Sequence, residues 1–146
     1  MIDTLSPEHL IIAPILIPMF AGAIMLLYDD RQRRAKLTIS LISAVALVLV
    51  AAELVSRAKG DPEISGTAIG LYLLGDWPTP MGIVLVLDRL SALMVALVAV
   101  LAIPALIYSA ATWHKQGQHF HSLFQFLLMG LNGAFLTGDL FNLFVF

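Results

Sequence analysis

The stretch LLMGLNGAFLTGDLFNLFVF, residues 127–146, shows what kind of protein this is, because it places amides and a carboxylate inside a run that is apolar enough to dissolve in lipid. It joins two apolar segments at residues 137–139. The second segment runs only over residues 140–146, whereas a spanning helix needs about 20 residues. We therefore expect the sequence to stop inside a membrane helix and to be the N-terminal part of a longer protein.

The composition excludes an ordinary soluble domain. The chain is 60% hydrophobic and 12% charged, whereas soluble domains are about half apolar and about a quarter charged. A net charge of -2 argues against a nucleic-acid surface, and zero Cys excludes disulfides and Cys-based metal sites. His119 and His121 are two apart and would point to different sides of a helix, so we expect a solvated loop there. No metal and no cofactor is predicted.

Apolar segments separated by short polar ones predict an all-α, polytopic transmembrane helix bundle that forms one membrane domain over residues 1–146. Between the second and third spans lies one long polar connection, residues 57–81. Residues 67–74 within it could pair as a short strand or lie along the membrane interface. The four full spans are predicted at residues 9–28, 37–54, 83–111 and 120–137, with the start of a fifth at 140–146.

The basic residues predict the orientation. Four cationic side chains lie within residues 29–36, and residues 113–121 also have net positive character. Because Lys and Arg are enriched in cytoplasmic loops, both segments should be cytoplasmic, with the N-terminus and residues 57–81 outside. The N-terminus is acidic and does not resemble a secretory signal, so the first span should be retained. We expect a multi-pass protein of the cell (inner) membrane, in contact with lipid.

The carboxylates near the predicted spans each have a structural explanation. Glu53 lies four residues before Arg57 on the same helical face, which favours an ion pair over a proton relay. Asp88 and Arg89 are adjacent and project about 100° apart, so each should need a partner elsewhere. For Asp88 we expect a fixed contact to another helix, or an interfacial position, rather than a role in carrying protons. Asp139 lies where the N-cap of the next helix belongs.

The amides of the fourth span share one face, since Gln125 and Asn132 are seven residues apart. That face either lines a hydrated path or forms hydrogen bonds across the bundle, and the second interpretation is favoured. Small residues on the same span, at Gly130, Ala134 and Gly138, predict a close approach by a neighbouring helix.

Two prolines in the first span, Pro14 and Pro18, are four residues apart and therefore lie on one face. They predict a kinked helix whose freed carbonyl groups are satisfied by neighbouring helices.

Residues 120–146, FHSLFQFLLMGLNGAFLTGDLFNLFVF, resemble the fourth span and the start of the fifth in the D subunit of the multi-subunit Mrp (Mnh, Pha) monovalent cation/proton antiporters. Residues 75–93, GDWPTPMGIVLVLDRLSAL, resemble the stretch that leads into the third span of the same protein. The order and spacing agree across the whole chain. The wider superfamily includes the antiporter-like pumping subunits of respiratory complex I.

The resemblance implies a roughly fourteen-helix subunit that exchanges Na⁺, or K⁺, for H⁺ at the expense of the proton-motive force, together with other subunits of the complex. In the family, a glutamate on the fifth span and lysines on later spans relay protons. That glutamate would fall just after Phe146, so no catalytic residue is assigned within this sequence. Asp139, Asn132 and Asp88 are candidates only for supporting polar roles.

Three alternatives remain open. The chain could belong to a proton-pumping subunit of complex I or of a membrane-bound hydrogenase, which the neighbouring genes would reveal. It could be a membrane anchor or assembly subunit without a transport role. A small dimeric drug exporter fits four helices but would want a buried carboxylate in its first span, and residues 14–28 contain none.

Overall fold

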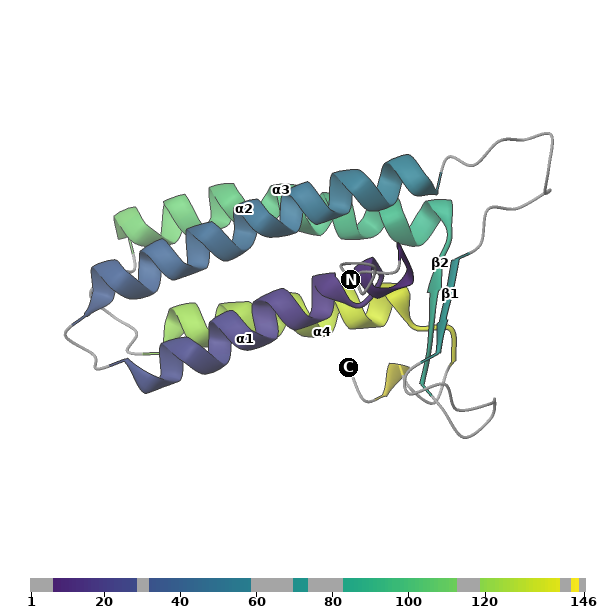
Figure 1. Ribbon diagram of the computed structural model, residues 1–146. Coiled ribbons are helices and arrows are strands. Elements are labelled where there is room, and N and C mark those ends of the chain that lie inside the picture. Colours follow the sequence, from purple (N-terminus) through teal and green to yellow (C-terminus); the bar gives the residue numbers. More distant parts are fainter. Residues whose placement is uncertain are drawn as a thin grey trace, which may run out of the picture.

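The computed structural model describes residues 7–28, 32–58, 70–73, 83–112, 119–139 and 143–144. Its four helices lie alongside one another, and two short strands and a short helix gather at one end (Figure 1). The fold is therefore mostly helical, as predicted. The elements in chain order are η1 (Pro7–Leu10), α1 (Ala13–Leu27), α2 (Arg33–Arg57), β1 (Gly70–Leu73), β2 (Val84–Leu87), α3 (Arg89–Thr112) and α4 (Phe120–Leu136).

Consecutive helices run in opposite directions (Figure 1). α1 contacts α2 and α4, α3 likewise contacts α2 and α4, and α2 and α4 also contact each other. The helix ends that join α1 to α2, and those that join α3 to α4, lie at the same end of the bundle, opposite the strands (Figure 1). The two basic segments thus share one end, which is the arrangement that charge counting predicts. Residues 29–31 and 113–118 of these segments lie outside the described residues.

Alanines of α2 and α3 lie in the buried core of the bundle. Five of them are at most 2% exposed, and small side chains at such positions let two helices approach closely. These residues are Ala44, Ala51, Ala92, Ala99 and Ala102.

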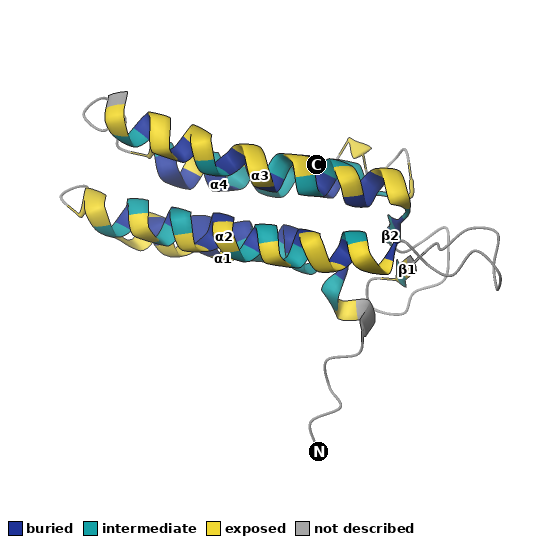
Figure 2. Cartoon of the chain, turned by 90° about the horizontal axis from the view of Figure 1, so that it is seen from above, coloured by how far each residue is buried: buried dark blue, intermediate teal, exposed yellow. Residues whose placement is uncertain are grey.

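All four helices carry large apolar side chains at exposed positions, and exposed positions are yellow in Figure 2. Leu49 on α2 is 68% exposed, and Leu123 on α4 is 65% exposed. A helix that is apolar on all sides is typical of a membrane span rather than of a surface helix in water. α2 and α3 are both long and apolar enough to cross a membrane, whereas α1 and α4 are apolar but shorter, with 15 and 17 residues.

The first helix begins later than predicted. α1 begins at Ala13, because Pro14 suits the first turn of a helix, where its missing N–H costs nothing. Residues 9 and 10, predicted as the start of the span, belong to η1 instead. His9 of η1 forms a hydrogen bond of 3.1 Å between its Nδ1 and the Tyr72 hydroxyl, which ties this turn to β1.

The prediction that the third span begins at residue 83 is wrong. Val84–Leu87 is strand β2, which pairs antiparallel with β1 so that Gly70 faces Leu87 and Tyr72 faces Leu85. Its residues are all apolar and only its two valines are β-branched, so they suit a strand as well as an apolar helix, and the partner strand decides between them. The possible strand in residues 67–74 is confirmed at Gly70–Leu73, and the rest of that range lies outside the described residues.

The C-terminal end of α4 joins the same small sheet. Thr137 has extended backbone angles and forms an antiparallel bridge with Leu85, and the Gly138 amide donates a 2.9 Å hydrogen bond to the Val84 carbonyl oxygen. A Cβ atom at Gly138 would overlap the Val86 side chain. The close approach predicted at Gly138 therefore exists, but its partner is a strand and not a helix.

Candidate functional site

A row of buried polar side chains runs along the side of α4 that faces the bundle interior. Ser122, Gln125 and Asn132 of α4 are each 0% exposed, and Ser40 and Ser43 of α2 are also buried. We call these five residues the polar row. Ser122 and Asn132 are ten residues apart, about 15 Å along a helix, which is half the thickness of a bilayer's hydrocarbon core.

Gln125 connects α4 to α2. The Ser43 hydroxyl donates a hydrogen bond of 3.0 Å to Gln125 Oε1, and Gln125 Nε2 donates one of 3.3 Å to the Ser40 carbonyl oxygen. The Ser40 hydroxyl in turn donates to Met25 Sδ on α1, at 3.5 Å. Both polar atoms of the Gln125 amide are therefore used, and the contact extends over three helices.

Asn132 connects α4 to α1. Its Nδ2 donates a hydrogen bond of 2.9 Å to the Pro14 carbonyl oxygen. In an α-helix that oxygen would accept from the N–H group of residue 18, but residue 18 is proline and has no N–H. The prediction that a neighbouring helix satisfies a carbonyl freed by the prolines is confirmed. Gln125 and Asn132 both bond across the bundle, as the favoured interpretation of their shared face expects.

Two atoms of the polar row lack a hydrogen-bond partner among the described residues. They are Asn132 Oδ1 and Ser122 Oγ, and both are buried. Leaving a buried polar atom unsatisfied costs about 1–3 kcal/mol, so such atoms are rare in folded proteins.

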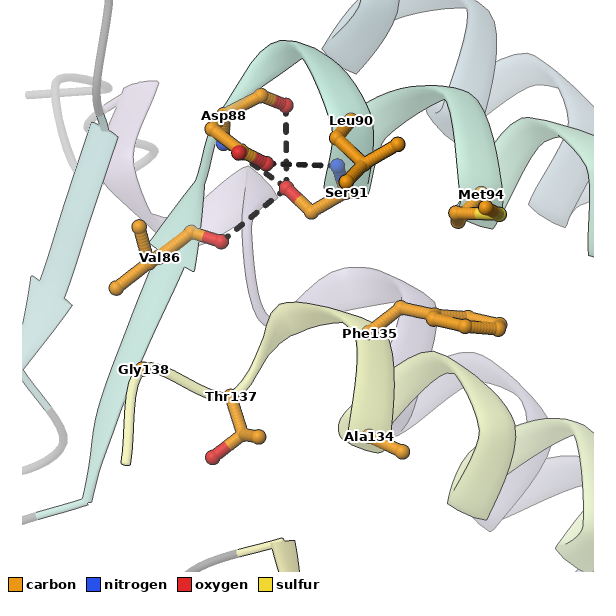
Figure 3. Close-up of a pocket in the computed structure, with 9 residues that line it drawn as sticks. All are labelled: Val86, Asp88, Leu90, Ser91, Met94, Ala134, Phe135, Thr137 and Gly138. Carbon is orange, nitrogen blue, oxygen red and sulfur yellow. Dashed lines mark hydrogen bonds between the residues drawn. The ribbon is translucent and has the colours of Figure 1, made fainter. Parts of the chain in front are cut away.

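A pocket of about 460 Å³ opens between the start of α3 and the end of α4, beside β2 (Figure 3). Its lining is largely apolar, and Asp88 and Ser91 lie on its α3 side. Asn132 is not among its lining residues. The lining residues are Val86, Asp88, Leu90, Ser91, Met94, Ala134, Phe135, Thr137 and Gly138.

Asp88 caps α3. The Ser91 amide donates a hydrogen bond of 2.7 Å to Asp88 Oδ1, and the Asp88 amide donates one of 2.9 Å to the Ser91 hydroxyl, which satisfies two donors at the helix start. Hydrogen bonds from Ser91, first from its side chain and then from its backbone, lower the pKa of the Asp88 carboxyl, which lies just before the helix. The expectation of a partner on another helix is therefore wrong for Asp88, because Ser91 lies one turn along the same helix.

Arg89 does find a partner elsewhere in the chain, at the C-cap of α2. Its Nε donates a hydrogen bond of 3.3 Å to the Ala58 carbonyl oxygen, just after the end of α2, where helical carbonyls lack intrahelical donors. The adjacent, oppositely charged side chains of Asp88 and Arg89 thus form hydrogen bonds at the start of α3 and just after the end of α2, respectively.

Glu53 and Arg57 form the predicted ion pair, with 2.9 Å between Oε1 and Nε. Asp139 is exposed, and its carbonyl oxygen accepts a 3.2 Å hydrogen bond from the Leu143 amide, as the carbonyl of an N-cap residue does. The predicted capping of residues 140–142 by its side chain lies outside the described residues. Among the described residues, no group of three or more His, Asp or Glu is placed to hold a metal ion.

The three predicted supporting residues do not form one site. Asp88 lies at the pocket, Asn132 lies inside the bundle against α1, and Asp139 is at the surface. Ser40 and Ser43 were not predicted from the sequence as partners of Gln125. Their spacing of three residues, which puts both on one helix face, is the signal that could have identified them.

No protein-family model matches the chain. It is 51% identical over 140 residues to the D subunit of a probable K⁺/H⁺ antiporter of Rhizobium meliloti, and 36% identical over 141 residues to the D subunit of a Na⁺/H⁺ antiporter of Alkalihalophilus pseudofirmus. It is also 36% identical to the N subunit of an NADH-quinone oxidoreductase of Desulforudis audaxviator. These similarities cover 94–95% of this chain, but the chain spans only about a quarter of the length of these curated relatives.

Two solved structures share the fold. A chain in the Mrp complex from Dietzia sp. DQ12-45-1b matches 97% of this chain with a TM-score of 0.82 at 23% identity, and the match covers 25% of that chain. A chain of an archaeal membrane-bound sulfane sulfur reductase matches 93% of this chain with a TM-score of 0.69, also at 23% identity, and the match covers 26% of that chain. The present chain is thus, over 95% of its own length, a homologue of the D subunits of Na⁺/H⁺ and K⁺/H⁺ antiporters, with the fold of part of an Mrp membrane complex.

Proposed function

We propose that this chain is part of a membrane subunit that exchanges a monovalent cation for protons, driven by the proton-motive force, together with other subunits of an antiporter complex. The observation that carries this proposal is the 51% identity to the D subunit of a probable K⁺/H⁺ antiporter over nearly the whole chain. We favour K⁺ as the cation, because the relatives named for Na⁺ are 36% and 32% identical.

In the proposed arrangement all four helices cross the membrane, and a fifth span begins after Asp139. α1 and α4 reach about 22 and 26 Å at 1.5 Å per residue, close to the 30 Å of a hydrocarbon core. The end that carries η1 and the strands faces outward, and the end with the two basic segments faces the cytoplasm. The exposed apolar faces of all four helices support contact with lipid or with further helices.

We assign positioning roles to the supporting residues. Asp88 holds the start of α3 and Asn132 holds α4 against α1, while the Asp139 carbonyl begins a further turn. Hydrogen bonds from Ser91 lower the pKa of Asp88, so its carboxylate stays charged at neutral pH and is unsuited to releasing and taking up protons. We therefore assign no proton-carrying role to Asp88 in this proposal.

The second candidate is a proton-pumping subunit of a quinone-linked or related respiratory complex. The 36% identity to the N subunit of an NADH-quinone oxidoreductase supports it, and so does the fold shared with a chain of a sulfane sulfur reductase. Redox subunits encoded beside this gene would favour this candidate, and a cluster of small antiporter subunits would favour the first.

The proposal is tested in everted membrane vesicles from a host that lacks its own antiporters and expresses this protein with its neighbouring genes. After respiration acidifies the vesicles, added K⁺ should release protons, which a pH-sensitive dye reports. Vesicles without this protein are the control. Proton movement that requires a redox substrate and ignores K⁺ and Na⁺ would overturn the antiporter assignment in favour of the second candidate.

A further inference from the structure

The two unpartnered atoms of the polar row call for a ligand. Ser122 Oγ and Asn132 Oδ1 are buried on residues that are 0% exposed, and neither has a hydrogen-bond partner among the described residues. The other atoms of the row are paired by short, well-defined contacts, such as the 3.0 Å bond between Ser43 and Gln125. Two unsatisfied atoms beside satisfied ones point to a partner that is not a side chain of the row.

The partner must be small. Because Ser122 and Asn132 are enclosed by this chain's own helices, another protein or a lipid cannot reach their side chains from outside the bundle. Only a group small enough to fit inside the bundle can approach. Two ligands of that size bind to an amide or hydroxyl oxygen, namely water and a bare monovalent cation.

The chemistry of the row favours water. Its five side chains are neutral, and Glu53, Asp88 and Asp139 lie near or beyond helix ends. A cation in a buried, neutral setting loses its hydration without a compensating negative charge, which is costly. A water molecule, in contrast, can donate to these oxygen atoms and is a common partner for buried polar groups.

We propose that the bundle binds two structural water molecules, one donating to Asn132 Oδ1 between α4 and α1 and one bonded to Ser122 Oγ beside the start of α4. The amide of Asn132 then has both ends satisfied, Nδ2 by the Pro14 carbonyl and Oδ1 by water. The water sites lie about 15 Å apart along α4 and flank Gln125, so the interior of the bundle is hydrated on both sides of the Gln125 contact. This inference does not depend on the proposed transport activity.

The direct test is a density map of the complete complex at a resolution that shows ordered water in its membrane domain. We expect a peak within hydrogen-bonding distance of Asn132 Oδ1 and another near Ser122 Oγ. A map that resolves other internal waters but shows none at either atom would overturn the proposal. A peak at only one of the two atoms would overturn the water site at the atom without a peak. A peak with the short contacts and several oxygen ligands of a metal cation would also contradict it.

A pair of matched variants tests the Ser122 site independently. Ser43→Ala removes a hydroxyl with a known protein partner, and its Tm in the complex should fall. If Ser122 binds water, Ser122→Ala should lower Tm by a similar amount. If no water binds Ser122 Oγ, the same change removes an unsatisfied group and should leave Tm unchanged or raise it. That result, with a lowered Tm for Ser43→Ala, would overturn the Ser122 site.

Discussion

Asn132 on α4 donates a 2.9 Å hydrogen bond to the Pro14 carbonyl oxygen on α1, and so replaces the backbone donor that Pro18 lacks. Pro14 and Pro18 are both fully buried, so water outside the bundle cannot satisfy this carbonyl. One amide thus makes a proline tolerable inside a buried helix. It also fixes the position of α4 along α1, because the freed carbonyl occurs at only one level of that helix.

The first prediction follows from this contact. Asn132→Leu should destabilise the protein by about 1–3 kcal/mol, because it leaves the Pro14 carbonyl buried without a donor. In a Pro18→Ala background the residue at position 18 regains an N–H that can bond to Pro14, so the same change should cost less. Denaturation of the purified complex, followed in a double-mutant cycle, measures the coupling.

Gln125→Leu is the matched control, because Gln125 bonds to α2 and not to Pro14. Its cost should be the same with Pro18 or with alanine at that position. An Asn132→Leu cost that is equally independent of residue 18 would show that the amide does not replace the missing donor.

The second prediction concerns the cap of α3. Asp88→Ala should lower stability by about 1 kcal/mol, because the Ser91 amide at the helix start loses its acceptor. Asp88→Asn should cost only a fraction of that, since Asn is also a good N-cap residue. Thermal unfolding of the three proteins at neutral pH gives the comparison, and equal losses in the two variants would show that charge, and not capping, is what matters.

The third prediction is the pH dependence of the same site. Hydrogen bonds from Ser91 lower the pKa of Asp88 in the folded state below its unfolded value of about 3.9. The stabilisation is therefore fully present above pH 4 to 5 and is lost as the pH falls through the lower, folded pKa. The wild-type protein should lose this stability in acid, whereas Asp88→Asn has no proton to gain there. A stability difference between the two that stays constant from pH 7 to pH 3 would contradict the assignment.

The sequence predicts the helices well and strand β2 badly, for one physical reason. Length and hydropathy identify α2, α4 and the end of α3 to within a few residues, because a long apolar run has few alternatives in lipid. Residues 84–87 are equally apolar, so they merge into the third span when only hydropathy is counted. Their strand depends on pairing with Gly70–Leu73, more than ten residues away, and periodicity within one segment does not contain that information.

The candidate site was predictable in its residue types but not in its pairings. The shared face of Gln125 and Asn132, and the need of the prolines for outside donors, follow from spacing alone. The pairings depend on the level at which α4 packs against α1 and α2. At the observed level Asn132 forms a hydrogen bond with Pro14, and Gln125 forms one with Ser43. For Asp88, the local partner Ser91 was concealed by the assumption that the helix had already begun at residue 83.

The fourth prediction is the orientation in the membrane. With no native Cys, a single thiol can be placed at Ser65, in the connection between α2 and α3, or at Gln116, between α3 and α4. Charge counting puts Ser65 outside and Gln116 in the cytoplasm. An impermeant thiol reagent added to intact cells should label the first variant and not the second, until the membrane is permeabilised. The opposite pattern would invert the proposed topology.

The last prediction tests the junction between α4 and the strands. Gly138 lies against β2, its amide bonded to the Val84 carbonyl oxygen, and a Cβ at this position would overlap the Val86 Cγ2 atom. Gly138→Ala should therefore separate the end of α4 from β2 and destabilise the protein, although alanine is otherwise the mildest substitution for glycine. In a Val86→Ala background the obstructing methyl group is gone, so most of the cost of Gly138→Ala should disappear.

Gly22→Ala on α1 is the matched control, because its Cβ would lie 3.2 Å from the Phe126 ring, a tight contact that a small shift of the ring relieves. Its effect should be smaller than that of Gly138→Ala and should not change with Val86→Ala. Because Gly138 and Val86 both line the pocket, the cycle also shows whether the pocket is held by this contact. If Val86→Ala fails to rescue Gly138→Ala, the glycine is required for its backbone conformation or its hydrogen bond, and the close approach to Val86 is not the reason for its presence.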